Sequence, residues 1–517
     1  MTTLPYPPPM AIEEAEPRVE IPPEGIDYSK KWYVLVAIAM AIFLGTVDGT
    51  MLNVALPTLV DDFDTTFAVA QWVVLSYLLT QTTLVLGFGR LGDMIGKKPI
   101  FTAGFAVFTL GSLFAAFSPT IGILIGARIF QGVGAAMIFA LGFAITTEAF
   151  PPSERGKALG INATIASIGI MAGPIIGGLI LEAASWQWIF LVNIPIGIVG
   201  TLTAVKFVAN TKPKGGESFD FVGAALFFVG LLTLLLGLTA GQEIGFANPV
   251  NLALFTTAAV SLVAFVLVER RIDHPMVDLS LFRSRDLSVN LVTGFAVFFA
   301  LAGLLLIAPF YLTDVMELSP RGIGLVLAAV PITMGIVSPF SGGLSDRIGS
   351  RPVTVAGLII MAVGYIVAAF LLAGATTAAA IFFVGLIVGL GMGIFHSPNN
   401  SAILGAVPHD KLGITSGMLS ITRITGTVTG IAVLGTVWAA RTVSYAGGGT
   451  AADAPAAAQA AGFADVMTAA AVILAGSFAL GWWALLRPRG SSPTRKIRRP
   501  RGARQWLPRP LRRTQSR

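Results

Sequence analysis

Long apolar runs recur along the whole chain and constrain its fold more than any other feature. A helix needs about 20 mostly apolar residues to cross the roughly 30 Å hydrocarbon core of a bilayer. The 517-residue chain contains about fourteen runs near that length, separated by short polar breaks. They are predicted at 32–56, 70–88, 99–118, 121–146, 157–181, 189–209, 221–241, 250–268, 289–312, 324–344, 352–373, 377–397, 413–440 and 463–486. The chain is therefore predicted to be an all-α polytopic membrane protein.

Composition supports a lipid environment. Hydrophobic residues make up 55% of the chain and charged residues 12%, whereas soluble proteins carry about 25% charged residues. The absence of cysteine excludes disulfides, thiolate metal sites and cysteine nucleophiles. The sequence shows no catalytic set, metal-ligand cluster or phosphate-binding P-loop motif. We therefore expect neither an enzyme nor a cofactor, and any transport would draw on an ion gradient.

Basic residues mark alternate breaks between the apolar runs. Lys30 precedes the first run, Lys97 and Lys98 follow the second, and a basic segment follows the last, with Arg321 and Arg441 as exceptions to the pattern. Cytoplasmic loops carry an excess of Lys and Arg. The pattern predicts a multi-pass cell-membrane protein with an even number of spans and both termini in the cytoplasm.

Two polar tails flank the apolar body. Residues 1–30 are rich in proline and acid and lack the basic start and short apolar run of a signal peptide, so we expect a disordered cytoplasmic lead-in. From Arg487 onward the chain carries 12 Lys or Arg and no acid. Directly after a span, this basic tail is expected to fix topology and to contact anionic lipid rather than nucleic acid.

A short polar sequence occurs twice. Residues 89–99 read GRLGDMIGKKP and residues 342–352 read GGLSDRIGSRP, with Gly, Leu, Asp, Gly, a basic residue and Pro in register. The candidate loop residues are Gly89, Asp93, Gly96, Lys97 and Lys98 in the first copy and Gly342, Asp346, Arg347, Gly349 and Arg351 in the second. Parallel repeats of this kind occur in many secondary transporters. The predicted organisation is a lead-in (1–30), a six-span half (31–210), an inserted pair (211–285), a second six-span half (286–487) and a tail (488–517).

Several motifs resemble those of a known family. The loop at 89–99 is similar to the signature loop of the major facilitator superfamily. The stretch with Arg128, Gln131, Gly132 and Gly134 resembles that superfamily's fourth-span motif. The stretch with Gly169, Gly173, Pro174, Gly177 and Gly178 resembles the superfamily's fifth-span antiporter motif.

Two further stretches narrow the resemblance. Residues 48–57 (DGTMLNVALP) and 186–197 (WQWIFLVNIPIG) are similar to the fourteen-span drug:proton antiporters of the EmrB/QacA type, with Gln187 departing from an expected Arg. The five motifs occur in the expected order, and the resemblance covers nearly the whole chain between the tails. The resemblance implies a major facilitator fold with two six-helix halves plus an inserted helix pair.

Three charged residues lie deep in predicted spans, where charge is costly and marks function. Asp48 lies eight residues before the predicted end of its span, and Arg128 lies seven residues after the start of its own. At 1.5 Å per residue both lie roughly 10–12 Å below the outer surface. We expect a water-connected pair in which protonation of Asp48 frees Arg128, with helix packing as the alternative role of Asp48. Arg423 is expected to bind anionic groups, to take part in coupling, or to pair with backbone carbonyls.

The loop and glycine motifs suggest moving parts. Asp93 is expected to cap the span that begins near Gly413 and so close the inner gate, unless the loop only sets topology. Gly89 and Gly96 would permit tight turns. The small residues of the antiporter motif favour close helix packing, and Pro174 favours a bend.

The resemblance implies the function. It implies proton-coupled efflux of small apolar or amphipathic compounds by alternating access, as in multidrug antiporters that confer antibiotic resistance. Candidate cargo contacts are Asn53, Trp72, Tyr77, Gln81 and Asn162. A dedicated exporter of one endogenous lipid or secondary metabolite, and a non-transporting receptor or scaffold, are the alternatives. The sequence leaves open the cargo, the proton stoichiometry, the oligomeric state and any envelope adaptor protein.

Overall fold

A computed structural model describes residues 27–151, 154–210, 220–272, 282, 284–372, 377–406, 412–451 and 454–486. Throughout these ranges the chain forms helices and turns, without strands. Fourteen of the helical segments are long and apolar enough to cross a membrane. The prediction of an all-helical polytopic protein is therefore confirmed. Most of the lead-in and the tail from Arg487 lie outside the described residues.

The helices follow the predicted order. The first six spans comprise α1 (Lys31–Asp62), α2 (Phe67–Ala70), α3 (Trp72–Ile95), α4 (Lys97–Ala116), α5 (Ile121–Ala149), α6 (Arg155–Ala183), α7 (Gln187–Leu191) and α8 (Asn193–Phe207). The next pair is α9 (Phe221–Ile244) and α10 (Pro249–Glu269). The last six comprise α11 (Arg285–Phe310) with the π-helical turn η4 (Tyr311–Val315), α12 (Pro320–Leu327), α13 (Ala329–Ile348), α14 (Ser350–Leu372), α15 (Ala378–Gly405), α16 (Leu412–Ala446) and α17 (Ala456–Leu486). We call α1–α8 the first half and α11–α17 the second half.

Many helix boundaries differ from the predicted ones, including those of the first and sixth spans. The first span was predicted to end at residue 56, but α1 continues through Pro57 to Asp62. Leu59 and Val60 beyond the proline are buried, so tertiary packing offsets the one backbone hydrogen bond that proline removes. The predicted sixth span, 189–209, is divided at Val192 into α7 and α8.

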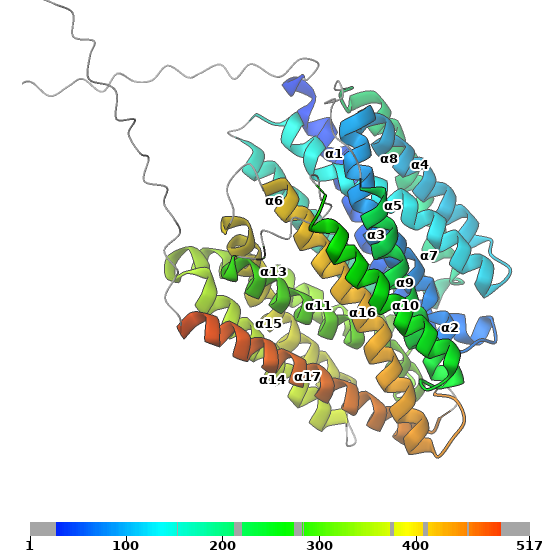
Figure 1. Ribbon diagram of the computed structural model, residues 1–517. Coiled ribbons are helices and arrows are strands. Elements are labelled where there is room, and N and C mark those ends of the chain that lie inside the picture. The colour runs from blue at the N-terminus through cyan, green and yellow to red at the C-terminus, as the bar shows by residue number, and fades with distance from the viewer. Residues whose placement is uncertain are drawn as a thin grey trace, which may run out of the picture.

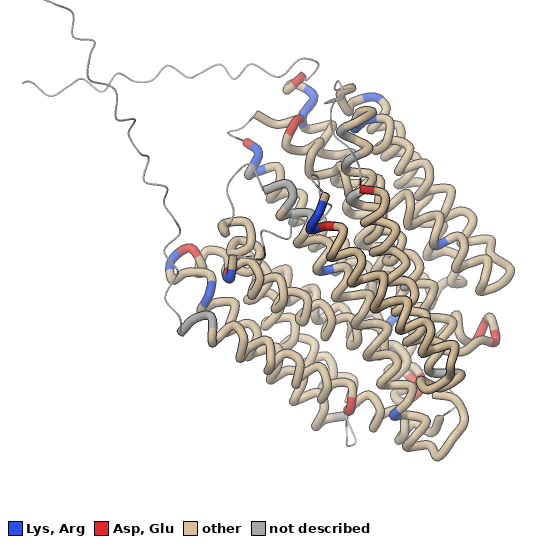
Figure 2. Tube along the Cα trace, in the orientation of Figure 1, with Lys and Arg blue, Asp and Glu red and all other residues tan. Residues whose placement is uncertain are grey.

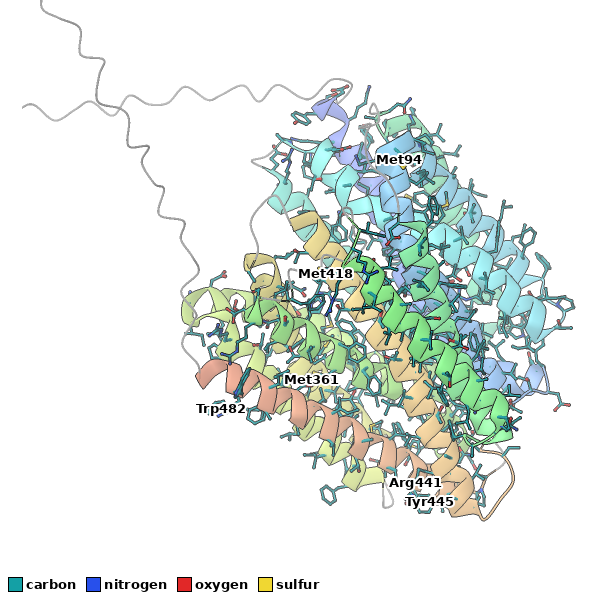
Figure 3. All side chains as sticks on the ribbon, in the orientation of Figure 1. Met94, Met361, Met418, Arg441, Tyr445 and Trp482 are labelled. Atoms are coloured by element: carbon teal, nitrogen blue, oxygen red, sulfur yellow. The ribbon has the colours of Figure 1, made fainter. Side chains whose placement is uncertain are left out.

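Both ends of the described chain lie on one side of the molecule. Figure 1 shows α1 beginning and α17 ending at the same end of the helix bundle, on its upper left side. We call this the terminal side and the opposite one the far side. In Figure 2 acidic and basic residues gather mainly near the helix ends, around a body almost free of them. Figure 3 places Trp482 on α17 toward the terminal side and Arg441 and Tyr445 at the far end of α16.

The buried apolar residues form one shared core and two separate ones. The largest cluster joins the halves and includes Val47–Val60 of α1, Leu304 and Phe310 of α11, and Trp438 of α16. A second cluster belongs to the first half alone and takes Val34–Leu44 of α1. A third, around Leu287 and Met418, belongs to the second half. Among the described residues the halves thus share a core toward the far side and have separate cores toward the terminal side.

The α9 helix contacts both halves with neighbouring residues. Trp72 Nε1 of α3 donates a hydrogen bond to Thr239 Oγ1 of α9 at 3.2 Å. Thr436 Oγ1 of α16 donates to the carbonyl oxygen of Leu238, also at 3.2 Å. Leu231 and Leu235 of α9 belong to the shared core. The inserted pair therefore contributes to the packing that closes the far side.

Candidate functional site

A fully buried polar cluster lies in the first half. Arg128 Nη1 of α5 donates to Asp48 Oδ2 of α1 at 2.6 Å. Asp48 Oδ1 accepts from Gln131 Nε2 at 3.0 Å and from Asn193 Nδ2 at 2.8 Å. Gln131 also donates to Ser112 Oγ at 2.8 Å. The carboxylate thus accepts three hydrogen bonds from two helices, α5 and α8, which fix its orientation.

Hydrogen bonds and aromatic rings hold the Arg128 guanidinium in place. Arg128 Nε donates to the carbonyl oxygen of Val73 at 3.0 Å, and Nη1 donates to Gln131 Oε1 at 2.5 Å. Its guanidinium lies 4.1 Å from the ring centre of Tyr77 and 5.8 Å from that of Phe190. Its Nη2 has no hydrogen-bond acceptor among the described residues. A buried cation of this kind depends on its carboxylate partner, because removing one member of a buried pair leaves an uncompensated charge.

Glycines bring the helices of this cluster together. A Cβ on Gly132 would lie 2.9 Å from the Tyr77 carbonyl oxygen, and one on Gly134 would overlap the Phe108 backbone. The two glycines of the fourth-span motif therefore let α5 approach α3 and α4 closely enough to place Arg128 and Gln131 beside Asp48. Small residues serve this purpose in membrane helix packing.

The glycine motif on α6 packs directly around Asp48. Side chains added at Gly169 and Gly173 would overlap Thr46 and Thr50 of α1, and one at Gly177 would lie 2.9 Å from the Met51 carbonyl oxygen. These α1 residues flank Asp48 in sequence. The motif therefore fixes the position of the helix that carries the acid.

The same motif reaches the other half. A side chain at Gly178 would overlap the Pro320 carbonyl oxygen of α12, and one at Gly324 would overlap that of Pro174. α6 thus packs on α1 with one face and on α12 with another. A movement of the second half against the first must change this contact.

A second charged centre lies in the second half. Arg423 of α16 donates through Nη2 to Asn400 Oδ1 of α15. Its guanidinium lies 5.4 Å from the ring centre of Phe298 on α11, and the His396 ring lies 6.2 Å from Phe298 in an edge-to-face arrangement. The four side chains are partly exposed. The contact with Asn400 differs from the backbone pairing that the sequence had left open.

The repeated loop has the same backbone shape in both copies. Gly96 and Gly349 have φ values of +102° and +89°, which favour glycine. Gly89, predicted to turn, instead lies inside α3 with no atom within 4 Å of an added Cβ. Asp93 lies in the last turn of α3, but the contacts of its side chain and the surroundings of Gly413 are not among the described features, so the predicted cap stays a prediction.

The remaining loop residues of the second copy lie at the terminal side of α13 and α14. Asp346 and Arg347 are exposed. Arg351 forms an ion pair with Asp286 at the start of α11. A Cβ on Gly342 would lie 2.9 Å from Ser397 Oγ. The second copy of the repeat thus connects four helices of the second half, α11, α13, α14 and α15.

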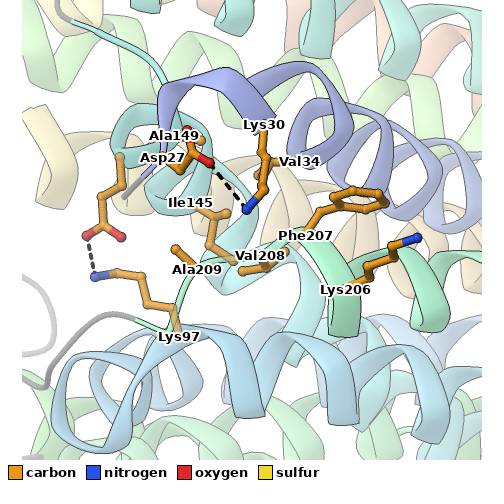
Figure 4. A pocket seen from close by; sticks show the side chains of 11 residues that line it. Asp27, Lys30, Val34, Lys97, Ile145, Ala149, Lys206, Phe207, Val208 and Ala209 are labelled. Carbon is orange, nitrogen blue, oxygen red and sulfur yellow. Dashed lines mark hydrogen bonds and ion pairs between the residues drawn. The ribbon is translucent and has the colours of Figure 1, made fainter. Parts of the chain in front are cut away.

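Lys97 has a specific partner. It pairs with Glu148 of α5 at 2.7 Å, beside a cavity of about 150 Å³ at the terminal end of the first half. Figure 4 shows Asp27, Lys30 and Lys206 around this cavity. Hydrogen bonds from Ser29 lower the pKa of the Asp27 carboxyl below its usual range. Lys98 is partly exposed. The first lysine of the loop thus ties α4 to α5 and does more than set topology.

The structure places most of the predicted cargo contacts within helix packing. Tyr77 is buried against Arg128, and Trp72 hydrogen-bonds to α9. Gln81 and Asn162 are buried, and Asn162 donates to Thr146 Oγ1 at 2.8 Å. Asn53 and Trp72 are partly exposed. In this conformation four of the five residues belong to helix packing rather than to an open surface.

The sequence reasoning missed two members of the buried cluster. Asn193 and Ser112 complete the network around Asp48 and Gln131. Asn193 lies in the apolar stretch 186–197 that carries part of the resemblance, so an amide in an otherwise apolar span was the available signal. Ser112 carries no comparable signal, because serine is common in membrane helices.

Comparison with known proteins decides the family. A model of the Major Facilitator Superfamily matches residues 38–418 and 290–516. The chain belongs to the major facilitator superfamily. A bacterial homolog of the human lysosomal transporter Spinster, solved in an inward-facing and unoccupied conformation, matches this superfamily member with a TM-score of 0.63 and 17% identity over 88% of this chain and 97% of that one. The fold prediction is thereby confirmed.

Curated relatives are transporters. The riboflavin transporter RibZ of Clostridioides difficile (strain 630) is 38% identical over 395 residues, 76% of this chain and 85% of the relative. The multidrug resistance protein Stp of Mycobacterium tuberculosis (strain CDC 1551 / Oshkosh) is 35% identical over 412 residues, 78% of this chain and 75% of the relative. The multidrug transporter protein MdtP of Bacillus subtilis (strain 168) is 28% identical over 414 residues, 80% of this chain and 76% of the relative. This member of the superfamily is therefore a multi-pass membrane transporter by family.

Proposed function

We propose that the protein is a proton-coupled exporter of small apolar or amphipathic compounds, of the fourteen-span antiporter type. The observation that carries the proposal is the buried ion pair of Asp48 and Arg128. α1 contributes residues up to Leu44 to the first-half core and residues from Val47 to the shared core. Asp48 thus lies where the closed far side gives way to the divided terminal side.

This position links protonation to movement. A proton on Asp48 would cancel the charge that balances Arg128, and an uncompensated buried cation costs several kcal/mol. The protein can lower that cost by letting the cluster open to water. Because α1 carries Asp48 and packs on α6, which packs on α12, such an opening would act on the contact between the halves. The proposed cycle is alternating access by rocking of the halves.

We infer the orientation of the protein in the membrane from the placement of its basic residues. The terminal side would face the cytoplasm, since Lys30, Lys97 and the basic tail lie at that end of their spans. The closed far side would then be the outer side, and the molecule would be open inward. Loop residues such as Asp93 and Asp346 would control the inner gate, and the tail would contact anionic lipid.

The relatives support two cargo ranges. Proteins named for multidrug resistance favour a broad range of compounds. The riboflavin transporter, at higher identity, favours a second candidate, the dedicated transport of one planar compound. A competition assay with unrelated compounds separates the two.

The test uses everted vesicles that contain the full-length protein. With a proton gradient, wild-type vesicles should accumulate a fluorescent dye and lose it when an uncoupler is added. Asp48→Asn should lower gradient-driven accumulation to the level of empty vesicles, because the amide cannot exchange a proton. Asp465→Asn is the matched control, since Asp465 pairs with exposed Arg441 far from the cluster. Full coupling in Asp48→Asn would refute the proposal.

A further inference from the structure

The charged centre in the second half has the composition of a ligand site. Arg423 makes no ion pair with any acid that the structure describes, and its one described side-chain hydrogen bond goes to Asn400. Two acids of the second half pair with other arginines, Asp286 with Arg351 and Asp465 with Arg441. Charges in membrane spans normally pair or line a functional path. Arg423 therefore lacks a counter-charge among the described residues and can offer its charge to a ligand.

The side chain is oriented toward the bundle and is accessible. It contacts α11 through Phe298 and α15 through Asn400, so it lies on the face of α16 that meets these helices and not on a lipid-facing one. Arg423, Asn400, Phe298 and His396 are all partly exposed.

The chemistry of the four side chains defines what they would bind. A guanidinium has five N–H donors in a planar fork and does not release its proton, so Arg423 is suited to binding an acceptor and not to carrying protons. Asn400 occupies one donor group and holds the fork in place. Phe298 and His396 offer aromatic faces on which a planar ring can stack. Arginine binds carboxylates and similar acceptor edges through two parallel hydrogen bonds.

We propose that Arg423, with Asn400, Phe298 and His396, recognises planar aromatic cargo through a negatively charged acceptor edge. The inference rests on the proposed function and narrows its cargo. It assigns cargo recognition to the second half and leaves the neutral pair of Asp48 and Arg128 to the proton. Cationic cargo of the same shape gains nothing from Arg423 and is repelled by it.

Two dyes with the same ring system and opposite charge test the proposal. Fluorescein is an anionic xanthene and rhodamine 123 a cationic one. Binding is measured by fluorescence anisotropy on purified full-length protein, and transport by accumulation in everted vesicles. Arg423→Gln should raise the Kd for fluorescein at least about tenfold, the loss expected for a charge-assisted hydrogen bond, and leave that for rhodamine 123 unchanged or lower. Arg423→Lys should fall between, because an ammonium keeps the charge without the planar fork.

The matched control is on the same helix. Arg441→Gln removes an exposed arginine of α16 that pairs with Asp465 and should leave both dyes unaffected, since exposed ion pairs contribute little. If Arg423→Gln does not fold, Phe298→Leu gives the second measurement and should weaken fluorescein binding severalfold. Equal effects of Arg423→Gln on both dyes, or no fluorescein binding by the wild type, would overturn the proposal.

The two proposals fail separately. Wild-type protein that binds fluorescein in an Arg423-dependent way but accumulates neither dye refutes export and leaves cargo recognition standing. Proton-driven accumulation of rhodamine 123 together with fluorescein binding that ignores Arg423 refutes recognition alone.

Discussion

The two halves of the molecule each hold an arginine within a span, but the surroundings differ. Arg128 is fully buried and balanced by Asp48, with Gln131 and Asn193 completing the network. Arg423 is partly exposed and has an amide and a ring as neighbours. The first centre is electrically neutral and closed, and the second is cationic and reachable. One fold repeated in parallel thus carries two different chemistries.

Under the proposed function, this difference would separate proton coupling from cargo recognition. A neutral, closed pair changes its charge only when a proton enters. An unbalanced cation at an accessible position responds to the charge of what binds beside it. If both halves held balanced pairs, neither centre would distinguish cargo by charge.

The largest expected effect tests whether the first centre is a pair. Asp48→Asn should destabilise the protein by about 3–5 kcal/mol, because it leaves Arg128 buried without a counter-charge. Arg128→Gln should cost a similar amount through the stranded carboxylate. The double variant should recover much of the loss, since neither charge remains. Thermal unfolding of purified protein, combined as a double-mutant cycle, measures this coupling.

The second centre supplies the contrast for that cycle. Arg423→Gln removes a cation that has no described acidic partner, so it strands no charge and should change the unfolding free energy by less than about 1 kcal/mol. If Arg423→Gln destabilises as much as Arg128→Gln, the two centres are alike and the comparison is wrong. Additive losses in the Asp48 and Arg128 double variant would equally contradict it.

The sequence predicted the helical fold, the order of the spans and the proximity of Asp48 to Arg128. That proximity was predicted correctly although one helix end used in the depth estimate was wrong. The depth argument placed the end of the first span at residue 56, whereas α1 extends to Asp62. The pairing does not depend on that end, because an acid and a base inside neighbouring spans each cost energy unless they meet. Chemistry therefore constrained the pair more strongly than helix boundaries did.

Other parts of the site could not be predicted from the sequence. Trp72 bonds to Thr239 across 167 residues of sequence, and only the packing of α9 on α3 brings them together. Gly89 and Gly96 belong to the same motif, yet only Gly96 has the positive φ that requires glycine. Which glycine turns the chain depends on where α3 ends, and helix ends are the least predictable feature of a sequence.

An intermediate effect is expected from changing the α6 glycine motif that packs around Asp48. Gly173→Ala should place a methyl group against Thr50 beside Asp48 and destabilise the protein by about 1–3 kcal/mol, with a matching loss of export. Thr50→Ala in the same chain should restore part of both by making room. Gly160→Ala on the same helix is the control, since no atom lies within 4 Å of its added Cβ. Equal effects at the two glycines would show that the loss does not come from contact with Thr50, and would remove the link to Asp48.

The smallest expected effect tests whether both centres lie behind one closed far side. The chain has no native cysteine, so Leu306→Cys gives a single thiol in the shared core. Adding Trp72→Phe removes the hydrogen bond to Thr239, worth about 0.5–1.5 kcal/mol, and should raise the rate of maleimide labelling about two- to tenfold. Trp482→Phe, an exposed position toward the terminal side, should leave the rate unchanged.

Because α9 bonds to α3 through Thr239 and to α16 through Leu238, faster labelling would mean that the inserted pair stabilises the closed far side for both halves. An unchanged rate in Trp72→Phe would mean that the direct contacts between the halves, such as α6 on α12, keep it closed without α9.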